Sequence, residues 1–172
     1  MKKAQKGFTL VELIVVIAII GILAAILVPS MMGYVKKSKL KSANSDAKLV
    51  FTTVNGAASD LVADGKDLAK IIDSSKCTGA ESSGAIAVSK LEGDKTKEPL
   101  SAAVKDALSE NGDNAGYVWW QFKVDGDKAT YKLAYAQWAS NDGVEDLVGQ
   151  YPDPEDNPDN LNTIGKVITK KS

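Results

Sequence analysis

The sequence predicts an α+β protein in which one long N-terminal helix packs its second half on an antiparallel β-sheet head. Three observations carry this prediction. A run of sixteen residues, Leu13 to Val28, has no polar side chain. Apolar residues then recur at spacings of three and four, and an Asp-Gly pair later separates two runs rich in aromatic and β-branched residues. We expect an apolar helix half at residues 8–30, an amphipathic half at 31–61 and a globular head at 62–172.

The apolar run is long enough to cross a membrane. With residues 8–12 it makes a segment of 21 residues, and a helix of that length spans roughly 30 Å, the thickness of a bilayer core. A secretory signal peptide is the alternative. However, the run is longer than a usual signal core, and no small-x-small cleavage site follows it. Lysines flank both ends, so the positive-inside rule leaves the orientation open.

Three residues interrupt this pattern. Glu12 places a carboxylate in the segment, which costs on the order of a few kcal/mol near a membrane centre and less near its edge. Either Glu12 reaches water at the interface, or it pairs with a positive charge in an assembly. Gly21 and Pro29 both weaken a helix. The stretch between them is either an ordinary kinked helix or one that unwinds when chains pack together.

Residues 6–13, Lys-Gly-Phe-Thr-Leu-Val-Glu-Leu, followed by the apolar run, resemble the prepilin signature of type IV pilins and pseudopilins. This signature carries a class III N-terminal methylation motif. The resemblance implies that residues 1–7 are a leader that stays in the cytoplasm. It also implies that a prepilin peptidase cuts between Gly7 and Phe8 and then methylates the new amine of Phe8.

The same resemblance implies roles for the interrupting residues and for partners. Glu12 would pair with the Phe8 ammonium of a neighbouring subunit during assembly, and Gly21 and Pro29 would soften the helix in the filament. The partners would be further copies of the chain in a helical filament, the prepilin peptidase, the pilus assembly platform and minor pilins. The precursor would cross the membrane once, and the mature chain would lie in an extracellular surface pilus.

The amphipathic half of the helix is predicted from seven apolar residues on one helical face. They are Leu40, Ala43, Ala47, Val50, Val54, Ala57 and Leu61. Asp64-Gly65 should end the helix. A variable connecting region, 62–116, should follow, with a helical turn at 67–73, a short strand at 86–88 and a helix that begins at Pro99.

An antiparallel sheet is expected at 117–151. Strands at 117–124 and 128–138 flank the Asp-Gly turn, and a third strand is expected within 144–151. The adjacent Trp119 and Trp120 must point to opposite faces of their strand. One should pack on the long helix. The other is either covered on the second face or exposed for binding.

The C-terminal loop and tail, 152–172, begin with a stretch rich in proline and carboxylates. We expect a solvated acidic loop without metal; calcium is the alternative. Its candidate ligands are Asp153, Glu155, Asp156 and Asp159. Residues 163–169 should form a terminal strand. The single Cys77 cannot close an intrachain disulfide, and in this the chain is similar to the disulfide-free major pilins of Gram-positive bacteria.

The composition disfavours catalysis and nucleic-acid binding. The 172 residues include no histidine, which excludes Ser-His-Asp and Cys-His mechanisms and zinc sites built on imidazole. All 21 basic residues are lysine and the formal net charge is -1, so neither bidentate guanine readout nor a global positive field is present. We expect no enzymatic activity, no cofactor and no nucleic-acid binding.

The sequence therefore predicts a structural subunit, a major pilin, of a type IV pilus that serves adhesion, surface motility or biofilm formation. A pseudopilin of a type II secretion or DNA-uptake system is the first alternative. A single-pass membrane-anchored extracellular enzyme or sensor domain is the second.

Overall fold

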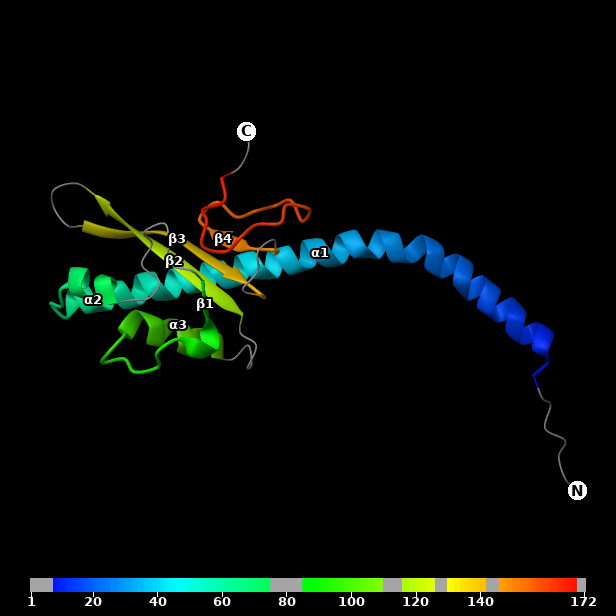
Figure 1. The fold of residues 1–172 in the computed structure, drawn as a ribbon, viewed down its shortest axis with the longest axis horizontal. Coiled ribbons are helices and arrows are strands. Elements are labelled where there is room, and N and C mark those ends of the chain that lie inside the picture. The colour runs from blue at the N-terminus through cyan, green and yellow to red at the C-terminus, as the bar shows by residue number, and fades with distance from the viewer. Residues whose placement is uncertain (1–7, 75–84, 110–115, 126–129, 142–145, 170–172) are drawn as a thin grey trace, which may run out of the picture. The chain divides into compact units, whose positions relative to one another are not determined.

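The computed structural model describes residues 8–74, 85–109, 116–125, 130–141 and 146–169 (Figure 1). The elements follow the predicted order: α1 (Leu10–Ala63), α2 (Leu68–Ser74), β1 (Ile86–Ala87), the 3-10 helix η1 (Val88–Lys90), α3 (Pro99–Ser109), β2 (Tyr117–Asp125), β3 (Thr130–Ala139) and β4 (Gly149–Tyr151). The chain divides into two compact units, residues 1–36 and 37–172. Helix α1 begins in the first unit and ends in the second.

The described part of the first unit is the apolar half of α1. This helix is long and apolar enough to cross a membrane, and none of its most apolar stretch is buried within the chain. Large apolar side chains such as Ile14, Ile22 and Ile26 are exposed. Exposed apolar surface of this extent has to be covered by lipid or by other protein chains.

The amphipathic half of α1 forms the spine of the head. Its buried residues repeat at spacings of three and four, as predicted, except that Ala58 and not Ala57 is the buried alanine. The helix ends at Ala63, two residues beyond the predicted boundary. Gly65 follows with a φ of 73°, while its N–H donates to the Val62 carbonyl at 3.0 Å and that of Lys66 donates to the Leu61 carbonyl at 3.0 Å. This is a Schellman motif, which satisfies the last carbonyls of the helix.

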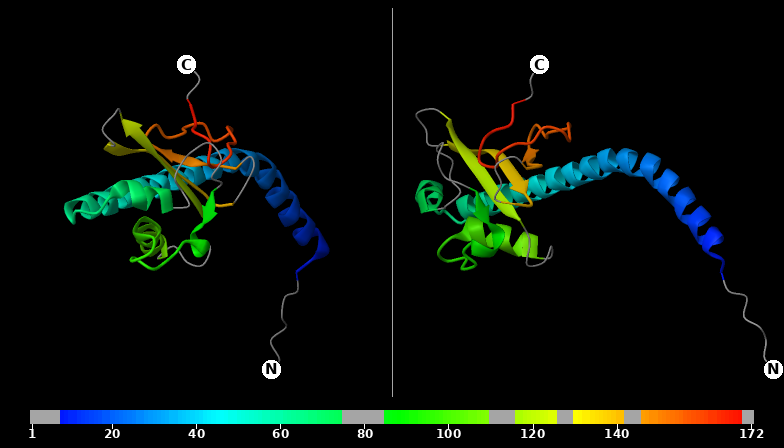
Figure 2. Two further views of the ribbon diagram at one scale, coloured as in Figure 1. Left: turned by 60° about the vertical axis from the view of Figure 1, so that its left-hand side comes forward. Right: turned by 45° about the vertical axis from the view of Figure 1, so that its right-hand side comes forward.

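Four antiparallel strands in the order β1-β2-β3-β4 make the sheet (Figures 1 and 2). The predicted hairpin is confirmed as β2 and β3, whose turn at 126–129 lies outside the described residues. The larger core joins α1, α3 and one face of β2, where Trp120 is 0% exposed. A second cluster holds Trp119, which is 4% exposed, against the C-terminal segment. Trp119 is therefore covered, and the alternative of an exposed binding tryptophan is wrong.

The C-terminal segment departs from the prediction. The third strand that was expected within 144–151 is present as β4, but it is only three residues long. Residues 163–169 do not form a strand. Gly165 has a φ of 92° there, and this left-handed backbone breaks an extended ladder. The segment instead folds back beside β3 and β4, as Figure 2 shows.

Two fully buried glutamine side chains, rather than a neighbouring strand, make the hydrogen bonds to the backbone of this segment. Gln137 on β3 accepts a hydrogen bond from the Gly165 N–H at 2.7 Å and donates to the Lys166 carbonyl at 2.6 Å. Gln150 on β4 accepts from the Ile168 N–H at 2.8 Å and donates to the Ile168 carbonyl at 3.0 Å. The two amides are also bonded to each other at 2.9 Å. A fully satisfied buried network of this kind fixes one arrangement of the tail.

Replacing Gln150 by leucine should destabilise the head by about 2–4 kcal/mol, because both backbone groups of Ile168 lose their buried partner. The measurement is the thermal unfolding midpoint of the full chain in detergent. Leu161→Ala, which truncates an exposed side chain of the same segment, is the matched control and should leave the midpoint nearly unchanged. Equal midpoints for Gln150→Leu and the parent would contradict the role given to this network.

Strand β4 lies directly against α1. Asn44 on α1 accepts a hydrogen bond from the Gln150 N–H at 3.1 Å and donates to the Glu155 carbonyl at 2.7 Å. A Cβ atom at Gly149 would overlap the Ala43 carbonyl group and the Asn44 nitrogen. Glycine at 149 is thus what permits the close approach of strand and helix.

Candidate assembly site

The start of α1 is closed by a reciprocal cap. The Thr9 N–H and hydroxyl both donate to Oε2 of Glu12, at 2.8 Å and 2.7 Å. The Glu12 N–H donates back to the Thr9 hydroxyl at 3.3 Å. This is a capping box, in which the first and fourth residues of the motif satisfy otherwise unpaired N–H groups at a helix start. The pattern Thr9-x-x-Glu12 directly before an apolar run is the sequence signal for it, and the apolar periodicity does not reveal it.

The cap changes how Glu12 can be accommodated. Its carboxylate meets two donors from its own chain, which lowers the cost of placing it in an apolar environment. Both bonds end on Oε2, and within the described residues no donor reaches Oε1. One oxygen is therefore engaged in the cap, and the other can accept a hydrogen bond from a group outside the chain.

Phe8 lies one residue before the cap, and its side chain is 81% exposed. Gly7, the other residue of the predicted cleavage site, lies outside the described residues. The structure thus places Phe8 and Glu12 at the same end of α1, with Thr9 between them in sequence.

Gly21 and Pro29 both lie inside a continuous α1. A Cβ atom at Gly21 would meet nothing within 4 Å, so packing inside this chain does not require glycine there. Pro29 has no N–H to donate to the preceding turn, which leaves one carbonyl without its helical bond. One residue later, the Ser30 hydroxyl donates to the Leu27 carbonyl at 2.9 Å. The unwinding of this stretch in a filament stays a prediction.

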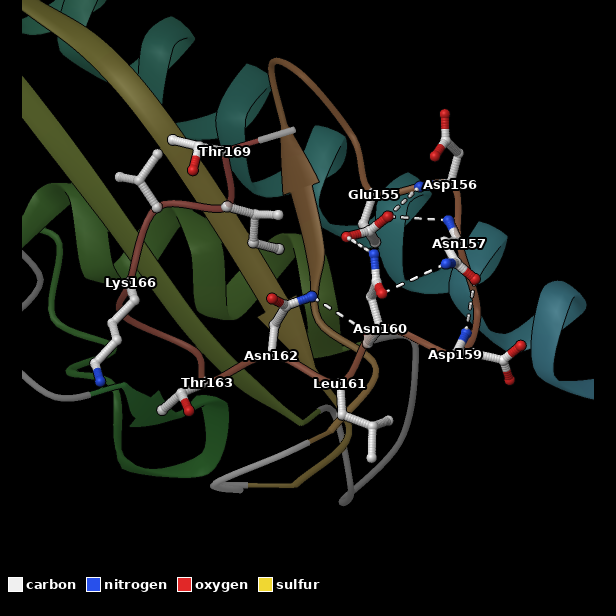
Figure 3. Close-up of a pocket in the computed structure, with 12 residues that line it drawn as sticks. Glu155, Asp156, Asn157, Asp159, Asn160, Leu161, Asn162, Thr163, Lys166 and Thr169 are labelled. Atoms are coloured by element: carbon white, nitrogen blue, oxygen red, sulfur yellow. Dashed lines mark hydrogen bonds between the residues drawn. The ribbon is translucent and has the colours of Figure 1, made fainter. Parts of the chain in front are cut away.

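The acidic loop is organised around one buried carboxylate (Figure 3). Glu155 is 7% exposed, and its Oε1 accepts from the N–H groups of Asp156 and Asn157 at 3.0 Å and 2.9 Å. Its Oε2 accepts from the Asn160 side chain at 3.3 Å. The carboxylates of Asp156 and Asp159 point away from Glu155 in Figure 3.

The candidate ligands of the calcium alternative do not converge. Over the described ranges of the chain, no group of three or more His, Cys, Asp or Glu side chains is arranged to hold a metal ion. The loop borders a pocket of about 920 Å³ whose walls come from residues 155–157, 159–163 and 166–169. Glu155 acts here as a backbone cap, which fixes the shape of the loop and the outward direction of its other carboxylates.

Comparison with known proteins finds one matching family model and several similar proteins. Residues 2–28 match the family model described as a prokaryotic N-terminal methylation motif. A fimbrial protein of Pseudomonas aeruginosa is 44% identical over 66 residues, which cover 38% of this chain and 40% of that protein. The chain thus spans about 40% of the length of the first such relatives.

Longer alignments reach into the head. A type IV major fimbrial protein FimA of Dichelobacter nodosus is 34% identical over 126 residues, 73% of this chain and 74% of that protein. A type IV major alpha-pilin of Moraxella bovis is 33% identical over 142 residues, 82% of this chain and 83% of that protein. No solved structure matches the chain. The similarity is therefore not confined to the methylation motif, because these alignments are far longer than the motif itself.

Proposed function

The chain belongs to the type IV pilin family, and from this premise we propose that it is a structural subunit, a major pilin, of a surface filament. The observation that carries the proposal is the apolar half of α1, which no part of the described chain covers and which contains most of the methylation motif. Lipid covers this surface in the precursor, and the same surface of other subunits covers it in the filament. The expected similarity to the disulfide-free pilins of Gram-positive bacteria stays a prediction.

Processing prepares the helix for assembly. A prepilin peptidase removes residues 1–7 by cutting between Gly7 and Phe8, and it methylates the amine of Phe8. The mature chain then consists of the membrane and filament-core half at 8–30, the amphipathic half at 31–61 and the head at 62–172. The leader stays on the cytoplasmic side, and the head is carried on the outer side.

Glu12 selects the register of each added subunit. Cleavage creates an ammonium group at Phe8, and a carboxylate buried in an apolar filament core is tolerated when it is paired with such a charge. In the chain's own cap, only Oε2 of Glu12 is occupied. Oε1 accepts from the Phe8 ammonium of a neighbouring subunit, so that a subunit in any other axial position leaves both charges unpaired.

The finer roles depend on a surface filament of this kind. The filament serves adhesion, surface motility or biofilm formation, and the subunit contacts the assembly platform and minor pilins. The chain itself serves as a structural subunit without catalysis in this proposal: its sequence offers no histidine for a Ser-His-Asp or Cys-His mechanism, and the proposed chemistry at its N-terminus is carried out by the peptidase.

Electron microscopy of whole cells tests the proposal. Deletion of this chain should remove surface filaments, complementation should restore them, and an antibody against the head should label them along their whole length. Filaments that persist after deletion, or a chain confined to membranes of cells that never make filaments, would overturn it.

Gly7→Trp should block processing, because the bulky side chain occupies the bond to be cut. We expect the chain to accumulate in the membrane with residues 1–7 still attached. The intact mass of the membrane-extracted chain measures this directly. Gln5→Ala, inside the same leader, is the control and should be processed normally. Complete cleavage of the Gly7→Trp chain would refute the predicted cleavage position.

A further inference from the structure

Two lysines face each other directly across the β2–β3 hairpin. Lys123 pairs with Lys132 in the strand register, and both side chains are exposed. Paired residues of neighbouring strands have side chains on the same face, about 5 Å apart at Cβ, and like charges in this position are destabilising. Within the described residues, neither lysine has an ion-pair partner. The fold therefore carries an unfavourable pair that a negative charge from outside would relieve.

These lysines border a groove of about 450 Å³ in the head. The groove is lined by Phe51 of α1, Lys123, Lys132, Pro152 and the β3 segment 133–135. No acidic side chain of the described residues lines it. Apart from the two lysines, the side chains that line it are thus apolar or aromatic.

The groove follows an open edge of the sheet. β4 pairs with β3 only at Ala136, Gln137 and Trp138. Beyond Ala136 towards the hairpin turn, β3 is paired with β2 on one side and, in the part of the chain described, with no strand on the other. An unpaired strand edge offers backbone hydrogen-bonding groups to another chain, and lysine on such an edge disfavours unspecific strand addition. A specific occupant has to bring negative charge.

We propose that the acidic loop of a second copy of this chain, residues 153–159, docks in this groove. The contact would join the globular heads of neighbouring subunits in the filament. The inference rests on the proposed function and adds a contact to it. Asp153, Asp156 and Asp159 are exposed, and the Glu155 cap fixes the loop that presents them. Loop and groove are therefore complementary in charge.

The positions of the two surfaces are compatible with the proposed filament. The loop is tied to α1 at Asn44, whereas the groove reaches α1 at Phe51. Seven residues along a helix correspond to about 10 Å. A neighbour displaced along α1 by about this distance brings its loop level with the groove. When the loop of one copy docks in the groove of the next in the same direction, each subunit keeps one of each patch open, and such heterologous contacts generate open helical filaments.

Charge exchange tests the contact without disturbing the head. Lys132→Glu places a carboxylate opposite Lys123, which removes the like-charge pair and should preserve or raise the unfolding temperature of the chain. The yield of sheared filaments should nevertheless fall by about tenfold, because the docking loop is now repelled. Adding Asp156→Lys to the same chain should restore most of that yield. An unchanged yield for Lys132→Glu, or no recovery in the double variant, would overturn the proposal.

Cross-linking separates this contact from filament formation itself. The parent is Cys77→Ser, since Cys77 is the only native cysteine. If neither that parent nor the unmodified chain forms filaments, the proposed function fails before the contact is examined. If the parent forms filaments, Lys132→Cys with Asp156→Cys should give an oxidised ladder of multimers from filaments. Lys132→Cys with Asp60→Cys, which replaces an exposed acid on α1 away from the loop, should give none. If filaments of the chain with Lys132→Cys and Asp156→Cys give no ladder, or if both double-cysteine chains give equal ladders, the proposed contact is wrong while the proposed function stands.

Discussion

Glu12→Ala is expected to reduce the yield of filaments by about two orders of magnitude or more, with membrane insertion and leader cleavage intact. The alanine removes the carboxylate that pairs with the Phe8 ammonium of the next subunit. An ammonium left unpaired in an apolar core costs about 3–5 kcal/mol, which converts to a loss of this size in each subunit addition. The measurement is an immunoblot of the sheared and membrane fractions from the same cells, together with the mass of the membrane-held chain.

Thr9→Ala is the matched control, because it removes the hydroxyl of the capping box and keeps the Glu12 carboxylate. Loss of a helix cap costs about 1 kcal/mol, so its effect on yield should be far smaller than that of Glu12→Ala. Normal filaments from the Glu12→Ala chain would remove the basis for the proposed pairing. Equal losses for the two variants would assign the role of Glu12 to the cap.

Gly149→Ala is expected to destabilise the head by about 3 kcal/mol or more, because the new Cβ overlaps the Ala43 carbonyl on α1. Strand β4 then has to move away from α1, and the bonds of Asn44 to Gln150 and Glu155 are lost with it. The expected result is a lower thermal midpoint of the full chain in detergent and faster proteolysis of the C-terminal segment.

Gly56→Ala provides the control for this substitution. Gly56 also lies in the head unit, inside α1, and a Cβ atom there would meet nothing within 4 Å. Alanine has a higher helix propensity than glycine by about 1 kcal/mol, so this variant should be as stable as the parent or more so. A Gly149→Ala chain that unfolds at the parent's temperature would show that β4 does not lie as close to α1 as described.

The elements with strong local signals were predicted well. The three- and four-residue spacing of Leu40, Ala43, Ala47 and Val50 predicted the buried face of α1, because helical burial is periodic in sequence. The two runs around the Asp-Gly pair predicted β2 and β3, since alternation and a turn signal occur together there. The cap at Thr9 and Glu12 also has a local sequence signal, but Glu12 was interpreted only through its charge.

The C-terminal segment could not be predicted in the same way. β-branched residues at 163–169 indicated a strand, but the hydrogen bonds come from Gln137 and Gln150, which are 18 to 29 residues distant in sequence from the groups of this segment that they bind. No local pattern reveals a side chain that replaces a strand neighbour. The need for glycine at 149 is equally hidden, because it depends on how closely β4 approaches α1.

The most direct measurement is the N-terminal mass of this chain in filaments sheared from intact cells. A subunit built for helix-packed assembly should be the abundant protein of that fraction and should begin at a methylated Phe8, without residues 1–7. A filament fraction that lacks the chain, or a chain that still begins at Met1, would contradict the account.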